Sequence, residues 1–113
     1  MKRIIASRGT GKSTELLRMA LEDKNAAIAV PNANYIRMYC EIANGVLGIP
    51  IEKIHEIVNC AEIDGVLVAP FFDFINHPQC SAFNRRNVYI DELELCIKWM
   101  MVYHNFVGYS LSI

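Results

Sequence analysis

Short apolar runs alternate along this chain with segments in which apolar residues recur at helical spacing. The runs 26–30 (AAIAV) and 66–69 (VLVA) contain no polar side chain, and a helical pattern follows each of them. Strands that are apolar throughout are buried on both faces, as in a mostly parallel sheet covered by helices on either side. The alternation therefore predicts an α/β fold, and the length of 113 residues suits a single domain over 1–113.

Five strands and five helices are expected from these patterns. The strands are expected at 2–7, 26–30, 66–69, 87–90 and 107–112. The helices are expected at 11–22, from a cap at Asn32 or Asn34 to residue 47, and at 51–61, 71–75 and 93–103. The dipeptide Asp64-Gly65 is expected to form a turn.

The overall composition excludes several classes of protein. Apolar residues make up 53% of the chain and charged residues 20%, which is enough for a packed core and unlike a disordered segment. The net charge of −1 is unlike that of a basic nucleic-acid-binding module. No apolar run approaches the roughly 20 residues that span a bilayer, so no membrane segment is expected. Four cysteines without a C-x-x-C pair indicate reduced thiols and a cytoplasmic protein.

A glycine-containing stretch, 7–14 (SRGTGKST), lies directly between the first expected strand and the first expected helix. Gly9 and Gly11 allow backbone conformations that are closed to other residues, so the loop can turn its amides inward around an anion. The helix that follows adds free N–H groups and the positive end of its dipole. In this pattern Lys12 reaches the β- and γ-phosphates of a nucleotide, and the Ser13 hydroxyl faces Mg²⁺. The alternative interpretation is a glycine turn with an exposed lysine.

Two adjacent carboxylates, Asp91 and Glu92, follow the expected strand 87–90. An acidic residue at the carboxyl end of a parallel strand lies beside a phosphate loop when the two strands are neighbours. Asp91 would then hold Mg²⁺ through its water shell, and Glu92 would orient or deprotonate an attacking water molecule. The alternative interpretation is a helix start, where the helix dipole favours acidic residues.

The segment 6–13 fits the pattern A-x-x-G-x-G-K-[ST], with Ala6 where the general P-loop pattern has glycine. It resembles the P-loop of helicases and of the large terminase ATPases of phages. An arginine often lies inside the loop of those terminases, as Arg8 does here. The stretch 87–92 is similar to a Walker B motif with an adjacent glutamate.

This resemblance to P-loop NTPases implies three groups of site residues. ATP would be bound by the loop residues Arg8, Gly9, Thr10, Gly11, Lys12, Ser13 and Thr14. Mg²⁺ would be held by Ser13 and Asp91. Catalysis would depend on Glu92 and Lys12.

The same resemblance implies the three-layer P-loop NTPase fold with a five-stranded, mainly parallel sheet. Its expected strand order places the last strand, 107–112, beside the first, 2–7. The strand 87–90 comes next, and the two intervening strands follow it.

The implied activity is Mg²⁺-dependent hydrolysis of ATP to ADP and phosphate by a core related to helicase and terminase motors. A glutamate beside the metal-binding aspartate favours water as the nucleophile over transfer to a small-molecule substrate. Arg8, Arg85 and Arg86 are the candidates for a cation on the γ-phosphate. The alternative, favoured by the small size and the lack of a clear arginine finger, is a nucleotide-binding regulator or assembly protein with little or no hydrolysis.

The sequence does not determine the partners of such a protein. The row 99–106 is rich in large apolar side chains, which core packing explains and a homo-oligomer contact explains as well. A role in phage or mobile-element DNA metabolism, with DNA or a phage or host protein as partner, is implied by the resemblance alone. In that case the protein would act in the host cytoplasm.

Overall fold

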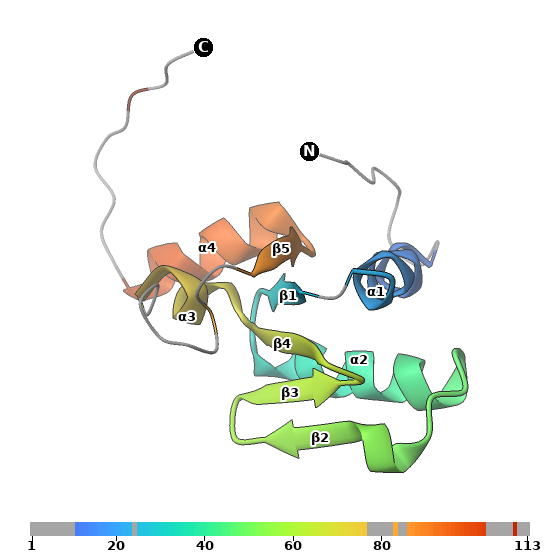
Figure 1. The fold of residues 1–113 in the computed structure, drawn as a ribbon. Coiled ribbons are helices and arrows are strands. Elements are labelled where there is room, and N and C mark those ends of the chain that lie inside the picture. Colours follow the sequence, from blue (N-terminus) through green and yellow to red (C-terminus); the bar gives the residue numbers. More distant parts are fainter. Residues whose placement is uncertain (1–10, 24, 77–82, 84–85, 104–109, 111–113) are drawn as a thin grey trace.

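The computed structural model describes residues 11–23, 25–76, 83, 86–103 and 110. Helices and strands alternate along them, except for three consecutive strands in the middle of the chain (Figure 1). The elements are α1 (Lys12–Leu21), β1 (Ala26–Val30), α2 (Ala33–Gly45), a 3-10 turn η1 (Ile51–Lys53), β2 (Ile54–Ile57), β3 (Cys60–Ile63), β4 (Val66–Pro70), α3 (Phe71–Asn76), β5 (Asn87–Ile90) and α4 (Leu93–Tyr103). The predicted α/β class is therefore confirmed.

All five strands form one mixed sheet in the order β2-β3-β4-β1-β5. The central strand β1 runs parallel to both β4 and β5, with Ile28 opposite Val68 on one side and Tyr89 on the other. The strand β3 is antiparallel to both β4 and β2. The carboxyl ends of β4, β1 and β5 therefore meet at one edge of the sheet, where ligands bind in open α/β folds.

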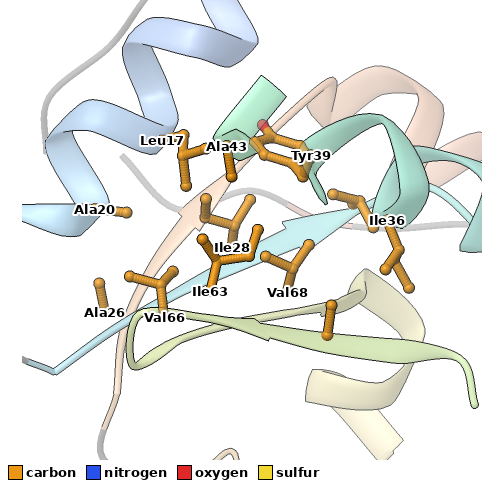
Figure 2. Close-up of a cluster of buried hydrophobic side chains, with 12 residues drawn as sticks. Leu17, Ala20, Ala26, Ile28, Ile36, Tyr39, Ala43, Ile63, Val66 and Val68 are labelled. Carbon is orange, nitrogen blue, oxygen red and sulfur yellow. The ribbon is translucent and has the colours of Figure 1, made fainter. Parts of the chain in front are cut away.

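Helices cover both faces of the central strand, which explains why it is apolar at every position. All five residues of β1 are buried. Ala26, Ile28 and Val30 belong to a large cluster with α1, α2, β3 and β4, and Figure 2 shows Ile28 beneath Leu17 of α1 and Tyr39 of α2. On the opposite face Ala27 joins a smaller cluster with β4 and α3. Side chains alternate between the two faces of a strand, so a strand buried on both carries no polar position.

The helices begin and end close to the predicted residues. Leu17 and Ala20 form the buried face of α1, as the spacing predicts. The predicted cap of α2 is confirmed at Asn32, whose side-chain oxygen accepts a hydrogen bond from the Asn34 amide at 3.0 Å. The range of α4 coincides with the predicted 93–103. Among the described residues, no helix combines the length and the apolar character needed to cross a membrane.

The predicted helix at 51–61 is wrong, because this segment forms η1, β2, a two-residue turn and the first part of β3. The residues Ile54, Ile57 and Val58 have helical spacing, yet Ile57 and Val58 are 62% and 86% exposed. Their spacing therefore marks no buried helix face. Asn59 has a φ of 62°, a left-handed conformation that interrupts a helix and that asparagine tolerates in turns.

The prediction of a mainly parallel sheet is also wrong for the described strands, since the β2–β3 and β3–β4 pairings are antiparallel. Both pairings involve β3, which begins within the segment where the helix was expected. The strand 87–90 was expected beside one of the two strands that lie between the motifs in the sequence. The pairing of β5 with β1 confirms this. The strand predicted at 2–7 lies outside the described residues. So does the strand predicted at 107–112, apart from Ser110, which belongs to no strand.

The turn between β3 and β4 depends on a glycine. Asp64 and Gly65 have φ values of 47° and 89°, and Ile63 pairs with Val66 across them, so the predicted turn is confirmed. We expect Gly65→Ala to lower the free energy of unfolding by about 1–2 kcal/mol, because a Cβ is strained in the left-handed conformation. Nothing lies within 4 Å of that Cβ, so the backbone alone causes the loss.

Gly45→Ala is the matched control, because a Cβ there also meets nothing within 4 Å. Gly45 is the last residue of α2 and has no positive φ. Alanine favours helix over glycine by up to about 1 kcal/mol, so this variant should be slightly more stable than the wild type. Urea denaturation measures both values, and equal effects of the two substitutions would contradict the role of Gly65.

Candidate functional site

The start of α1 meets the end of β5 at the carboxyl edge of the sheet. The Ser13 hydroxyl donates a hydrogen bond to Oδ2 of Asp91 at 2.7 Å, across 78 positions of the sequence. Beside it, the Lys12 ammonium forms an ion pair with Glu92, and both side chains are largely shielded from solvent. Four of the residues predicted to form the site therefore lie together in the folded chain.

The described part of the predicted phosphate loop forms the N-terminus of α1. Gly11 caps this helix with φ 80° and ψ 18°, a conformation that glycine adopts without strain. Its carbonyl accepts the first helical hydrogen bond, from the Glu15 amide at 3.0 Å. Thr14 lies in the same first turn and is partly buried. The other predicted loop residues Arg8, Gly9 and Thr10 lie outside the described residues.

The carboxylate of Asp91 is buried, with 4% of the residue exposed. Its Oδ2 accepts a second hydrogen bond from the Tyr39 hydroxyl at 2.5 Å. Its amide donates to the Ala29 carbonyl at 3.0 Å and so extends the pairing of β5 with β1. Burial, together with the nearby charge of Asp91, raises the pKa of Tyr39, which keeps the phenol protonated as a donor. The carboxylate is therefore held from α1 and α2, and the backbone of Asp91 is held by β1.

The helical spacing of apolar residues after Asn34 predicts Tyr39 on the inner face of α2 but does not reveal this contact. The residue is fully buried within the cluster between α1 and α2. A signal for its role does exist, because a buried tyrosine needs a hydrogen-bond partner for its hydroxyl. The sequence does not reveal which of the distant polar groups that partner is.

Glu92 has an unusual backbone conformation at the turn from β5 into α4, with a φ of 55°. Its carbonyl accepts a hydrogen bond from the Cys96 amide at 2.9 Å, so α4 begins immediately after it. Burial and the charge of Asp91 raise the pKa of Cys96 to about 12, which keeps that thiol protonated. Residues other than glycine occupy left-handed conformations at some energetic cost, and such residues cluster at functional sites.

A second set of contacts ties the far end of α1 to the start of β5. The side chain of Asn87 donates to Asp23 at 2.9 Å, and the hydroxyl of Tyr89 donates to the same carboxylate oxygen at 3.2 Å. The amide of Asn25, followed by the Asn87 side chain, lowers the pKa of Asp23 below its ordinary value. The helix α1 is thus attached to β5 at both ends.

We expect the stabilising effect of Asp23 to depend on pH. A carboxyl group with a lowered pKa in the folded state stabilises the protein above its ordinary pKa and loses this effect as pH falls through the folded value. The variant Asp23→Asn should therefore be less stable than the wild type at neutral pH, and the difference should shrink from about pH 5 toward pH 2. Urea denaturation across this range measures it. A difference that stays constant with pH would contradict the contribution of Asp23.

The candidate cation Arg86 lies at the wrong edge of the sheet for a contact with a γ-phosphate. Its guanidinium donates to the carbonyls of Ala26 at 3.0 Å and Gly65 at 3.3 Å. These carbonyls mark the starts of β1 and β4, whereas Asp91 follows the end of β5. Arg86 is therefore a structural residue of the amino edge, and the other candidate, Arg85, lies outside the described residues.

A separate cavity of about 310 Å³ lies between the first turn of α2 and the β2–β3 hairpin. Its lining includes Arg37, Glu56 and Asn59, and it contains none of the residues predicted to bind a nucleotide. Within the part of the chain that the structure describes, no group of three or more His, Cys, Asp or Glu side chains is arranged to hold a metal ion. The candidate site thus consists of the Ser13–Asp91 and Lys12–Glu92 contacts.

Comparisons of this chain with protein-family models, with curated proteins and with solved structures find no match.

Proposed function

We propose that this protein binds ATP with Mg²⁺ at the start of α1 and hydrolyses it to ADP and phosphate. The observation that carries the proposal is the hydrogen bond of 2.7 Å between Ser13 and Asp91. It joins the hydroxyl of a G-K-S-T helix start to the acid at the end of a parallel strand. P-loop NTPases use these two groups to hold Mg²⁺ beside the terminal phosphates of a nucleotide.

The oxygen donors of Ser13 and Asp91 fit Mg²⁺ in kind. This cation prefers oxygen ligands and keeps several of its water molecules, so one hydroxyl and one carboxylate are sufficient protein partners. When bound, it would neutralise the charge that develops on the transferred phosphate. The Ser13 hydroxyl can direct a lone pair to a cation while it still donates its proton to Asp91 in a hydrogen bond.

Lys12 and Glu92 have linked roles in this proposal. The incoming phosphates would compete with Glu92 for the ammonium group of Lys12, since both are anionic. A Glu92 carboxylate released from Lys12 would be free to accept a proton from water. The oxygen of that water would attack the γ-phosphorus as the bond from the γ-phosphorus to the bridging oxygen breaks, which leaves ADP.

The fold proposed for the whole chain is the three-layer P-loop NTPase fold. It would place 2–7 beside β5, on the side away from β1 and next to the acidic pair. The β2–β3 hairpin is then an addition at the opposite edge of the sheet. A role in phage or mobile-element DNA metabolism, a partner such as DNA or a host protein, a homo-oligomer and a cytoplasmic location are further parts of the proposal, and they rest on the resemblance of the loop alone.

A nucleotide-binding regulator with little hydrolysis is the second candidate. The ion pair of Lys12 with Glu92 favours it, because this pair occupies both the phosphate-binding cation and the proposed base. The position of Arg86 at the amino edge favours it as well, since that residue cannot supply the cation that speeds hydrolysis.

Two measurements on the wild-type protein test the proposal. Calorimetry should detect ATP binding in the presence of Mg²⁺, and a phosphate-release assay should detect turnover above the rate without protein. Binding without turnover would favour the regulator, and the mass in solution with an ATP analogue would then show whether an assembly forms. No binding heat at millimolar ATP would overturn both candidates.

A further inference from the structure

We propose that Tyr39 is a positioning residue for the Mg²⁺ site, which it serves by fixing the carboxylate of Asp91. The inference rests on the proposed function and adds a third element, α2, to a site that sequence patterns assign to α1 and β5 alone. The Tyr39 hydroxyl donates to Asp91, the residue proposed to hold the metal. It acts through Asp91.

Two donors from different helices converge on the same oxygen of Asp91. Ser13 of α1 donates at 2.7 Å and Tyr39 of α2 donates at 2.5 Å, both to Oδ2. The two helices pack against each other and against β1 in the main core cluster. The carboxylate is therefore oriented by groups whose positions the core itself determines.

The ring of Tyr39 is anchored more firmly than the serine side chain. It is fully buried, and Figure 2 shows it beside Ala43, with the hydroxyl oxygen pointing away from Ile28 and Val68. A ring packed in this way cannot swing aside without opening the core. The Tyr39 hydroxyl is therefore the rigid member of the pair of donors.

The two donors have different tasks when a cation is present. Ser13 must share its hydroxyl between Asp91 and the metal, whereas Tyr39 donates its only proton to Asp91 alone. Partners that orient metal-binding groups in this way typically contribute about 10–100-fold to metal affinity.

The test compares Tyr39→Phe with Tyr89→Phe. Both substitutions remove one hydroxyl that donates to a carboxylate, but the partner of Tyr89 is Asp23 at the far end of α1. In calorimetric titrations at fixed ATP, Tyr39→Phe should need about 10–100-fold more Mg²⁺ for half-maximal binding. Its binding of ATP in EDTA should be unchanged, and Tyr89→Phe should match the wild type in both titrations.

The outcomes separate this inference from the proposed function. If the wild type binds ATP with Mg²⁺ and Tyr39→Phe has the same Mg²⁺ requirement, the positioning role is overturned while the proposed function stands. If the wild type does not bind ATP, both are overturned. A merely structural role would lower the thermal stability of Tyr39→Phe and leave the Mg²⁺ requirement unchanged.

A measurement on the wild type covers the case in which Tyr39→Phe does not fold. The ¹³Cζ resonance of Tyr39 reports on the hydrogen bond of its hydroxyl. It should shift when Mg²⁺ is added to the ATP-saturated protein, because the metal draws charge from the Asp91 carboxylate. An unchanged resonance would overturn the positioning role.

Discussion

Glu92→Gln should lower the rate of phosphate release by about 10²–10⁴-fold, the usual contribution of a general base. Glutamine is close in shape to glutamate but cannot accept the proton of the attacking water. Because the ion pair of Glu92 with Lys12 competes with the phosphates for the ammonium group, the variant should bind ATP at least as tightly as the wild type. Phosphate release and calorimetry measure the two effects separately.

Glu94→Gln is the matched control for this variant. Glu94 lies two residues further along, in the first turn of α4, and is exposed to solvent. Its substitution removes the same charge from the same helix start without touching Lys12, so phosphate release should stay at the wild-type rate. Equal losses in the two variants would mean that the charge near α4 matters and that Glu92 has no specific role.

Lys12→Ala should weaken ATP binding by about tenfold to a hundredfold, the loss expected for hydrogen bonds to a charged group. The removed ammonium group lies at the N-terminus of α1, where the helix dipole alone would attract the phosphates less strongly. Binding is measured by calorimetry at saturating Mg²⁺. Arg18→Ala is a control on the same helix, because its exposed side chain lies one turn or more from the site.

The double variant Lys12→Ala/Glu92→Gln separates binding from stability. Lys12→Ala leaves the shielded carboxylate of Glu92 without its partner, so the single variant should also be less stable than the wild type. Adding Glu92→Gln should restore stability and should not restore ATP binding. If the double variant recovered wild-type affinity, Lys12 would serve only to neutralise Glu92.

Local patterns predicted most of the helices and the parallel part of the sheet. The apolar run 26–30 became β1, and Asn32 caps α2 as predicted. These predictions are correct because burial on both faces requires a continuous apolar run and a helix cap requires a particular side chain, and both can be recognised in a short stretch of sequence. The contact of Ser13 with Asp91 could also be predicted, because both residues are expected to hold the same Mg²⁺ ion.

Other features depend on contacts between distant residues and could not be predicted from local spacing. The β2–β3 hairpin was not predicted, because the helical spacing of Ile54, Ile57 and Val58 indicates a helix more strongly than Asn59 indicates a turn. Tyr39 was missed because its partner lies 52 positions away. Arg86 has the residue type of a phosphate-binding cation, and only its bonds to Ala26 and Gly65 reveal that it lies at the opposite edge.

The attachment of α1 along β5 has a consequence for how the protein is made. The helix α1 is synthesised well before β5 and the residues from Asn87 to Glu92 that are its polar partners. Bringing such distant segments together costs chain entropy and slows folding. Nascent chains still lacking β5 should therefore carry α1 with its polar ends unpaired. The contacts of Lys12 and Ser13 with the acidic pair then form only after β5 has joined the sheet, and the proposed nucleotide binding would report that step.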